Sequence, residues 1–254
     1  MFQKTFIYSS IASIGLYFKM LGRVLKKHQK WSIFRELIFK EISDLCINSL
    51  NIVIFISIFM GAIIAIQTNY NLLSNHFIPK YFIGIATRQS VILEFAPTMI
   101  SIILAGKVGS YIASSIGTMR ITEQIDALDV MGVNSLNLLV LPKIIAGLTF
   151  FPLLIAISMI TSVLGGWIAG AVVGSFSPED YLIGVQMNFK PFQIIYSFTK
   201  TLFFSFVIIT VPSFYGYYVN GGALEVGRAS TKAVVWTIVH IIVLNYLLTK
   251  VILK

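Results

Sequence analysis

Glu94 is the ionisable residue whose setting most suggests a functional role. It opens the run EFAP, ending at Pro97, inside sequence apolar enough for a membrane. A carboxylate at membrane depth is costly and usually faces protein or a wet cavity, and Pro97 frees a backbone carbonyl there. Either Glu94 and Pro97 line a transport path or a hinge beside it, or Glu94 pairs with Lys200 or Arg88 or reaches water. For Lys200, extension to the interface is favoured over contact with a lipid phosphate.

Side chains that could carry catalysis are sparse. The three histidines are scattered and Cys46 is the single cysteine, so no spacing indicates a metal site. The sequence has no Gly-x-x-x-x-Gly-Lys-Ser/Thr phosphate loop, no His-Glu-x-x-His and no Gly-x-Ser-x-Gly. We therefore expect no catalytic residue, no metal and no cofactor, and any ATP that drives this protein would be hydrolysed by another subunit.

The composition is that of a membrane protein. Of the 254 residues 57% are hydrophobic and 11% charged, with a mean hydropathy of +0.86, whereas soluble domains carry about 25% charged residues. The net charge of +9 could suggest nucleic acid. Because the basic residues lie beside apolar segments, where membrane topology requires them, we expect no nucleic-acid partner.

Five apolar segments predict an all-α membrane protein with about five transmembrane helices. They cover residues 46–67, 82–115, 143–174, 192–219 and 233–253. Polar sequence separates them, including a Gly-rich segment at 220–232 that is expected to be a loop. The natural division is an N-terminal basic region, 1–45, and one polytopic membrane domain, 46–254.

The N-terminal region is unlike a signal peptide, because its apolar segment precedes its basic cluster. Apolar side chains recur at helical spacing from Ile7 to Leu21, which predicts an amphipathic helix lying on the membrane with its lysines on anionic headgroups. The alternative is a disordered or cleaved leader. The positive-inside rule then orients the chain. With a cytoplasmic (or stromal) N-terminus, 13 Lys and Arg residues fall on that side and five on the other.

A polar segment, Met119 to Asn134, predicts a short amphipathic helix on the cytoplasmic side. At 100° per residue, apolar side chains share one face and acidic ones lie roughly opposite, namely Ile121, Ile125 and Leu128 against Glu123, Asp126 and Asp129. Arg120 is spaced to pair with Glu123, and Gly132 stands where glycine ends a helix. Such a helix is too short to be stable alone. It is either a coupling helix in a groove of a cytoplasmic subunit or an ordinary interfacial loop helix.

Two stripes of small residues recur at every fourth position. In lipid such stripes let helices approach closely, either between subunits or, as we favour, within one chain. They are Gly109, Ala113 and Gly117, and Gly166, Gly170 and Gly174.

The run LAGKVGSYIASSIGTMRITEQIDALDVMGVNSLNLLVLPKIIAG, residues 104–147, resembles the signature region of the MlaE-type ABC transporter permeases. The run GGALEVGRAST, residues 221–231, resembles the second cytoplasmic motif of that family. The resemblance extends over roughly residues 41–253. One position departs from the family pattern, because Leu93 stands where an Arg often precedes the glutamate.

The resemblance implies a permease of a bacterial inner membrane or a plastid envelope, and the Lys-rich composition weakly favours an organelle. It implies a homodimer with two cytoplasmic or stromal ABC ATPase subunits and an MCE-domain lipid-binding protein, moving phospholipids or related lipids between membranes. Glu94 and Pro97 become candidates for the lipid cavity. The ATPase-coupling helix would contain Thr122, Glu123, Ile125, Asp126, Leu128, Asp129 and Met131, and the second cytoplasmic loop Glu225, Gly227 and Arg228.

Two other functions are compatible with the sequence. A self-sufficient secondary transporter would work without an ATPase, although such proteins usually place several ionisable groups or two matching halves at mid-membrane. A non-transporting anchor subunit would use the polar helix only for recruitment. If the chain is a permease driven by a separate ATPase, an Ile125→Asp change is expected to uncouple ATP use from transport.

Overall fold

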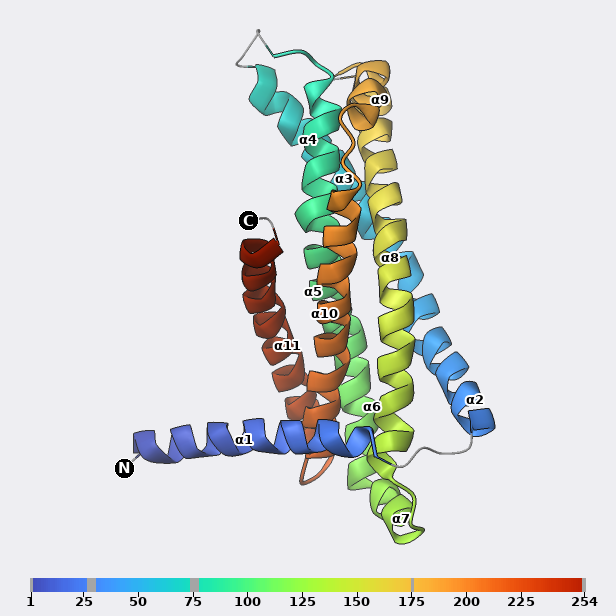
Figure 1. The fold of residues 1–254 in the computed structure, drawn as a ribbon, viewed down its shortest axis with the longest axis vertical. Coiled ribbons are helices and arrows are strands. Elements are labelled where there is room, and N and C mark those ends of the chain that lie inside the picture. The colour runs from blue at the N-terminus through green and yellow to red at the C-terminus, as the bar shows by residue number, and fades with distance from the viewer. Residues whose placement is uncertain (1, 27–30, 74–77, 175, 253–254) are drawn as a thin grey trace. The chain divides into compact units, whose positions relative to one another are not determined.

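The computed structural model describes residues 2–26, 31–73, 78–174 and 176–252, and all regular structure in these residues is helical (Figure 1). In chain order the helices are α1 Phe2–Val24, α2 Trp31–Glu41, α3 Asn48–Leu73, α4 Phe82–Ser90, α5 Ile100–Leu104, α6 Ser110–Ile121, α7 Gln124–Val130, α8 Ser135–Val173, α9 Pro178–Gln186, α10 Phe192–Tyr217 and α11 Ala223–Ile252. The all-α prediction is confirmed.

Five helical stretches of the described chain are long and apolar enough to span a membrane, as the sequence predicts. They are Phe34–Leu72, Phe82–Ile121, Ser135–Val173, Phe192–Tyr217 and Ala223–Ile252. The first, third and fifth begin about ten residues earlier than predicted. Hydropathy marks only the apolar part of a helix, whereas the backbone hydrogen bonds continue into polar sequence until a turn interrupts them.

Three wider, π-helical segments interrupt the first two spans. They are η1 Ile42–Ile47, η2 Val91–Met99 and η3 Ala105–Gly109. Pro97 lies inside η2, and because proline lacks the N–H that a regular helical turn would use, a locally wider turn accommodates it. Glu94 belongs to the same segment, so the carboxylate singled out in the sequence stands on irregular backbone.

The chain divides into two compact units. Unit 1 contains residues 1–45, 105–147 and 206–239, and unit 2 contains residues 46–104, 148–205 and 240–254. The N-terminal 45 residues thus share a unit with two later segments.

In unit 1, α1 is fastened at its C-terminal end. The Asn134 side-chain amide donates hydrogen bonds to the carbonyls of Arg23, at 2.9 Å, and Lys26, at 2.7 Å, and Asn137 donates one to the Val24 carbonyl at 2.6 Å. Together with the Lys26 N–H, which donates to the Arg23 carbonyl, these bonds occupy carbonyls at and just beyond the end of α1. Toward its middle, Tyr17 shares a hydrogen bond of 2.7 Å with Thr210, and burial raises the pKa of Tyr17.

The first small-residue stripe lies against other helices of unit 1. A Cβ added at Gly109 would meet the Pro212 ring at 3.2 Å, and one added at Gly117 would meet Val226 at 3.0 Å. Ala113 is fully buried, and its carbonyl oxygen would be 2.7 Å from a Cβ added at Gly216. The stripe therefore packs α6 against α10 and α11 within one chain.

In unit 2 the second stripe packs only in part. A Cβ at Gly166 would collide with the Tyr181 side chain and one at Gly170 with the Phe176 ring, at 2.6 Å in the latter case. Tyr181 is fully buried and donates a hydrogen bond to the Val163 carbonyl. Gly174 is a correction: it follows the end of α8 with a φ of +68° and open space around it. It serves the turn, where glycine tolerates left-handed backbone.

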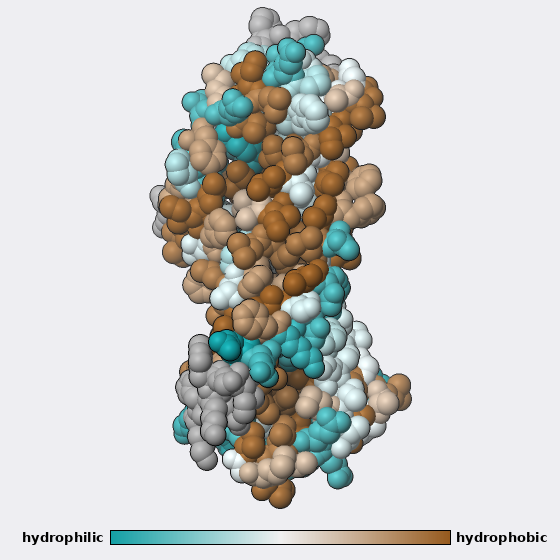
Figure 2. All heavy atoms as spheres, turned by 90° about the vertical axis from the view of Figure 1, so that its right-hand side faces the viewer, coloured by the Kyte–Doolittle hydropathy of each residue, from teal (hydrophilic) through white to brown (hydrophobic). Residues whose placement is uncertain are grey.

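Much of the surface is apolar, as a lipid-facing protein requires. Figure 2 shows hydrophobic side chains covering wide areas of one face. The helices differ in how far the protein covers them. In the most apolar 18-residue stretch of α10, 61% is buried in the protein, whereas in the corresponding stretch of α11 only 11% is buried. Another molecule, lipid or protein, must therefore cover most of α11.

Candidate functional site

Glu94 lies at the centre of a polar cluster in unit 2. Its Oε1 accepts a hydrogen bond of 2.7 Å from Lys200 Nζ, which makes an ion pair, and a longer one of 3.4 Å from the Tyr196 hydroxyl. Its Oε2 accepts bonds from the Asn245 amide at 3.1 Å and the Thr98 hydroxyl at 3.3 Å. Three segments, η2, α10 and α11, thus converge on one carboxylate.

Further bonds join the partners of Glu94 to one another. The Tyr196 and Thr249 hydroxyls share a hydrogen bond of 2.9 Å, and Thr98 donates one of 3.2 Å to Asn245. We call Glu94, Thr98, Tyr196, Lys200, Asn245 and Thr249 the Glu94 cluster. Its members supply one anion, one cation and several groups that both donate and accept hydrogen bonds.

The prediction for Lys200 is wrong, because its side chain is fully buried and does not extend to the interface. Its Nζ lies 4.5 Å from the centre of the Tyr196 ring. A buried ammonium needs a nearby anion or a ring face to offset its lost hydration, and Glu94 with Tyr196 provides both. The Glu94 side chain itself is 41% exposed. The lysine of this pair is therefore shielded from solvent, whereas the glutamate is partly accessible.

A second buried ion pair, which the sequence analysis did not single out, lies in unit 1. Lys143 Nζ contacts Glu41 Oε1 at 2.5 Å, and both side chains are largely buried. The other oxygen, Glu41 Oε2, is buried without a hydrogen-bond partner among the described residues. Beside the pair, Tyr111 donates a 3.5 Å bond to Asp44. The Glu41 carboxylate is thus largely buried, although Tyr111 beside the pair is 45% exposed.

The polar segment expected to be one helix from Met119 to Asn134 is two pieces. The first piece, α6, ends at Ile121, and Glu123 adopts a left-handed backbone with φ of +61° before α7 begins at Gln124. Figure 1 shows α7 as a short helix following this bend. Gly132, with φ of +75°, follows the other end of α7, and the Val133 N–H bonds back to the Leu128 carbonyl, which is the stop expected of that glycine.

Arg120 has a different partner from the expected Glu123. Its guanidinium contacts Asp126 at 2.6 Å and lies 5.9 Å from the centre of the Tyr217 ring. The left-handed residue Glu123 turns the chain, so the i, i+3 geometry of a continuous helix does not apply. Tyr217 in turn shares a 3.0 Å hydrogen bond with Ser135 at the start of α8. These contacts connect α7 to the ends of three longer helices.

One side of α7 faces its own chain and the other is open. Ile125 is fully buried and Leu128 half-buried, as the helical spacing predicts. Thr122, Glu123, Asp126 and Asp129 are exposed, and so are two apolar residues at the end of α7, Val130 at 88% and Met131 at 68%. An exposed apolar pair beside acidic groups, outside the spans, is typical of a protein contact surface.

Comparison with known proteins identifies the family. The sequence profile of the family Permease MlaE matches residues 38–251. The chain belongs to the MlaE permease family. A probable ABC transporter permease protein of Rickettsia bellii is 34% identical over 87% of this chain and 85% of its own length. The intermembrane phospholipid transport system permease protein MlaE of Haemophilus influenzae is 25% identical over 92% and 89%. The protein TRIGALACTOSYLDIACYLGLYCEROL 1, chloroplastic, of Arabidopsis thaliana is 28% identical over 61% of this chain and 45% of its own length.

As an MlaE family member with five apolar spans, the chain is an integral, multi-pass membrane protein of a bacterial inner membrane or a plastid envelope. Leu93, where the MlaE permeases often have an Arg, contributes its carbonyl, which accepts a 3.4 Å bond from Lys200. The glutamate that follows it is therefore paired from another helix. Among the described residues no group of three or more His, Cys, Asp or Glu is placed to hold a metal ion.

The second MlaE-like motif is helical, where the sequence predicted a loop. Glu225, Gly227 and Arg228 all lie in the first turns of α11, which begins at Ala223. Arg228 pairs with Glu225 at 2.6 Å, a contact that fits the i, i+3 spacing of a helix. Only the stretch around Gly221, with φ of +117°, forms the turn. The glycines predicted that no helix would form here. The sequence Ala-Leu-Glu-Val that follows them favours a helix, and the negative charge of Glu225 is favourable in its N-terminal turn.

Proposed function

We propose that this chain is the permease subunit of an ABC transporter that moves phospholipids or related lipids between membranes, with ATP hydrolysed by a separate cytoplasmic or stromal subunit. Family membership and the names of the relatives support the lipid and the transporter class. The observation that carries the ATPase part is the surface of α7, which is fastened to its own chain by Ile125 and Arg120 and exposes Asp129, Val130 and Met131.

The contacts of α7 suggest how a movement of the ATPase subunits would be transmitted to the permease. When the ATPase subunits close on ATP, the exposed side of α7 moves with them. Because Asp126 holds Arg120 and Arg120 lies against Tyr217, the displacement reaches the ends of α6 and α10 in unit 1. Packed helices shift as rigid groups rather than deforming continuously. The two permease halves of a homodimer would then move against each other.

The Glu94 cluster is the proposed place for a lipid headgroup. Acyl chains need apolar walls, and a headgroup needs a few donors and acceptors of hydrogen bonds. The cluster supplies both charges, with the Glu94 carboxylate open and Lys200 held behind it. A headgroup amine can approach Glu94, and a phosphate can accept bonds from Tyr196, Thr98 or Asn245. Pro97, buried one turn beyond Glu94, shapes the wall and does not bind.

The remaining partners follow from the same proposal. A second copy of this chain would cover the exposed apolar face of α11, which includes Trp236, Ile242, Tyr246 and Leu247. A lipid cavity at such an interface would place the Glu94 cluster beside it, because Asn245 and Thr249 come from α11. An MCE-domain protein on the opposite side from the ATPase would receive or deliver the lipid. No cofactor is needed in this chain.

An ion-coupled transporter is a second candidate, favoured by one observation. Glu94, which pairs with Lys200 of α10, stands on an interrupted helix inside a span, which is an arrangement found in secondary transporters. Such a protein would move its substrate without an ATPase. A non-transporting anchor would assemble with the ATPase but move no lipid.

The test compares two charge reversals in the full chain purified from its native membrane. Asp129→Lys alters the exposed side of α7, and Glu179→Lys alters another exposed acidic residue, in the first turn of α9. Mass spectrometry of the co-purified proteins is expected to find a stoichiometric ATPase with the wild type and Glu179→Lys but much less with Asp129→Lys. Equal recovery of the ATPase with both variants would overturn the assignment of α7, and recovery of none with the wild type would favour the second candidate.

A further inference from the structure

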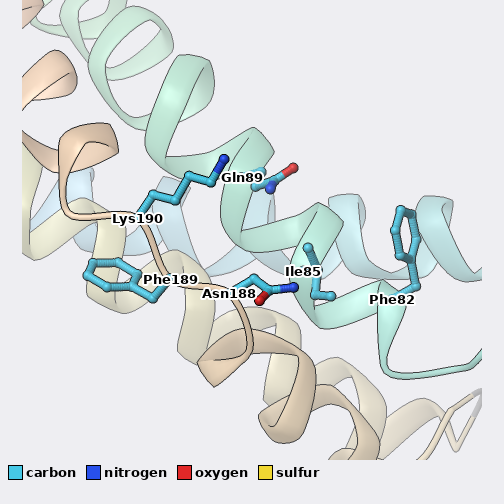
Figure 3. A pocket seen from close by; sticks show the side chains of 6 residues that line it. All are labelled: Phe82, Ile85, Gln89, Asn188, Phe189 and Lys190. Carbon is cyan, nitrogen blue, oxygen red and sulfur yellow. The ribbon is translucent and has the colours of Figure 1, made fainter.

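A pocket of about 430 Å³ opens in unit 2, between α4 and the segment that joins α9 to α10. Figure 3 shows its six lining side chains, three from each side. Phe82, Ile85 and Phe189 are apolar, Gln89 and Asn188 are carboxamides, and Lys190 is a cation. The lining thus combines an apolar wall with three polar side chains that donate hydrogen bonds, and it includes no carboxylate.

The wall of this pocket is held by a buried arginine. Arg88, only 2% exposed, donates hydrogen bonds to the carbonyls of Val185 at 2.5 Å, Met187 at 2.8 Å and Asn188 at 3.3 Å. Its guanidinium also lies 5.6 Å from the centre of the Phe189 ring. One side chain of α4 therefore fixes the backbone and one ring of the opposite wall. The pocket wall is therefore held in place by specific side-chain contacts.

Two further features keep the pocket rigid. The helices α4 and α9 touch through backbone, because a Cβ on Gly84 would collide with the Tyr181 carbonyl and one on Gly184 with the Tyr81 carbonyl. Asn188 adopts a left-handed backbone with φ of +52°. Such a conformation costs free energy for a residue other than glycine and persists where the surroundings impose it.

The charge around the pocket is positive and uncompensated. Among the residues that the structure describes, neither Arg88 nor Lys190 forms an ion pair with a carboxylate. Carbonyl oxygens and a ring face are the groups that contact Arg88, and its Nε is buried without a hydrogen-bond partner in the described part of the chain. Lys190, the cation of the lining, is exposed and has no carboxylate partner in the described part of the chain, so this pocket is suited to an anion.

The position of the pocket narrows the choice of anion. Phe82 is the first residue of the second span and Phe192, two residues after Lys190, is the first residue of the fourth. Phe82, Phe189 and Phe192 are all about half exposed, so apolar rings lie on the surface where the two spans begin. An anion at this place that also needs an apolar wall is a phospholipid.

We propose that this pocket binds the phosphate headgroup of a phospholipid in the leaflet opposite the cytoplasm. Lys190 supplies the positive charge, Gln89 and Asn188 donate hydrogen bonds to phosphate oxygens, and Phe82 and Ile85 cover the first part of an acyl chain. Arg88 is a positioning residue that holds the wall. The site is separate from the Glu94 cluster, and its occupation needs neither ATP nor an ATPase.

The test uses the full chain in vesicles that contain phosphatidylglycerol with a photoreactive group on one acyl chain. After illumination, labelled peptides are mapped by mass spectrometry. The site predicts labelling within residues 82–89, and Lys190→Gln is expected to lower this labelling about fivefold, the effect of one cation at a membrane surface. Lys80→Gln, which removes an exposed cation outside the lining, is the matched control and should leave the labelling unchanged.

Two further arms decide what the pocket recognises. Photoreactive diacylglycerol, which lacks the phosphate, should label residues 82–89 weakly, and excess free glycerol phosphate should not displace the phospholipid. Equal labelling of Lys190→Gln and the wild type, or equal labelling by diacylglycerol, would overturn the proposal. Displacement by free glycerol phosphate would overturn the assignment to a membrane lipid. Because no ATP is present, these outcomes are independent of the proposed transport function.

Discussion

Among the described residues, each of the two units contains one ion pair between a buried lysine and a glutamate, and the two pairs differ in what surrounds the carboxylate. In unit 1, Glu41 is 16% exposed and one of its oxygens has no partner in the described chain. In unit 2, Glu94 is 41% exposed and both oxygens accept bonds from side chains of other segments. A closed pair holds helices together. An open pair with several polar neighbours can exchange partners, which is what a ligand site requires.

The largest expected effect is on the stability of unit 1. Lys143→Met leaves Glu41 buried without a counterion, and breaking one partner of such a pair costs about 3–5 kcal/mol. The free energy of unfolding in a bilayer is the measurement. Lys200→Met should cost clearly less, because Glu94 keeps three other hydrogen-bond donors and contact with water. Equal losses for the two variants would remove the distinction between the pairs. The double variant Glu41→Gln with Lys143→Met should recover most of the loss.

The two sides of α7 provide a second contrast. Ile125→Asp places a charge at a fully buried position and should destabilise the protein by about 3 kcal/mol or more. It would stop transport by unfolding, and therefore cannot by itself show uncoupling. Met131→Asp, at an exposed position of the same segment, should leave the unfolding free energy within about 0.5 kcal/mol while reducing ATPase recovery. A large loss of stability in Met131→Asp would show that this side is not a free surface.

A change in the Glu94 cluster should affect lipid movement more than stability. Glu94→Gln preserves the shape but removes the charge, so the hydrogen bonds from Lys200 and Asn245 weaken. Losing one charge-assisted bond to a headgroup would reduce the rate of lipid movement about tenfold. The matched variant is Glu41→Gln in unit 1, which should change the rate little per folded molecule. If Glu41→Gln slowed lipid movement more than Glu94→Gln did, the Glu94 cluster would not be the lipid site.

The smallest effect concerns the attachment of α1. Asn134→Ala removes two hydrogen bonds to the carbonyls of Arg23 and Lys26, which should cost about 1 kcal/mol. Hydrogen exchange of the last turn of α1 should become faster, while exchange in α9 of unit 2 stays unchanged. Unaltered exchange in α1 would mean that Asn137 and the packing of Met20 and Val24 are enough to hold it.

Local patterns in the sequence predict much of this fold. Long apolar runs identify the five spans, because a helix is the way to satisfy backbone hydrogen bonds in lipid. The spacing of Ile125 and Leu128 correctly predicts the inward side of α7, and Gly132 predicts its end. The presence of a carboxylate within a span also points to Glu94 as a residue with partners.

The errors arise where a contact depends on segments far apart in the chain or on one backbone angle. Lys200 meets Glu94 across 106 positions, and no local pattern shows that this lysine within a span is buried. The Arg120 to Asp126 pair depends on the left-handed turn at Glu123, which a helical wheel does not represent. The partners of Arg88 are backbone carbonyls, so no side-chain pattern predicts the pocket wall.

The most direct test of the central claim is lipid transfer between vesicles by the purified assembly, with fluorescent phospholipid in the vesicles that carry this chain. Transfer should require ATP and stop when the nucleotide site of the co-purified ATPase is inactivated, although the assembly itself stays intact. It should also fall sharply with Asp129→Lys and remain normal with Glu179→Lys. Lipid transfer that continues at the same rate with an inactive ATPase would contradict the account and identify this chain as a transporter that works alone.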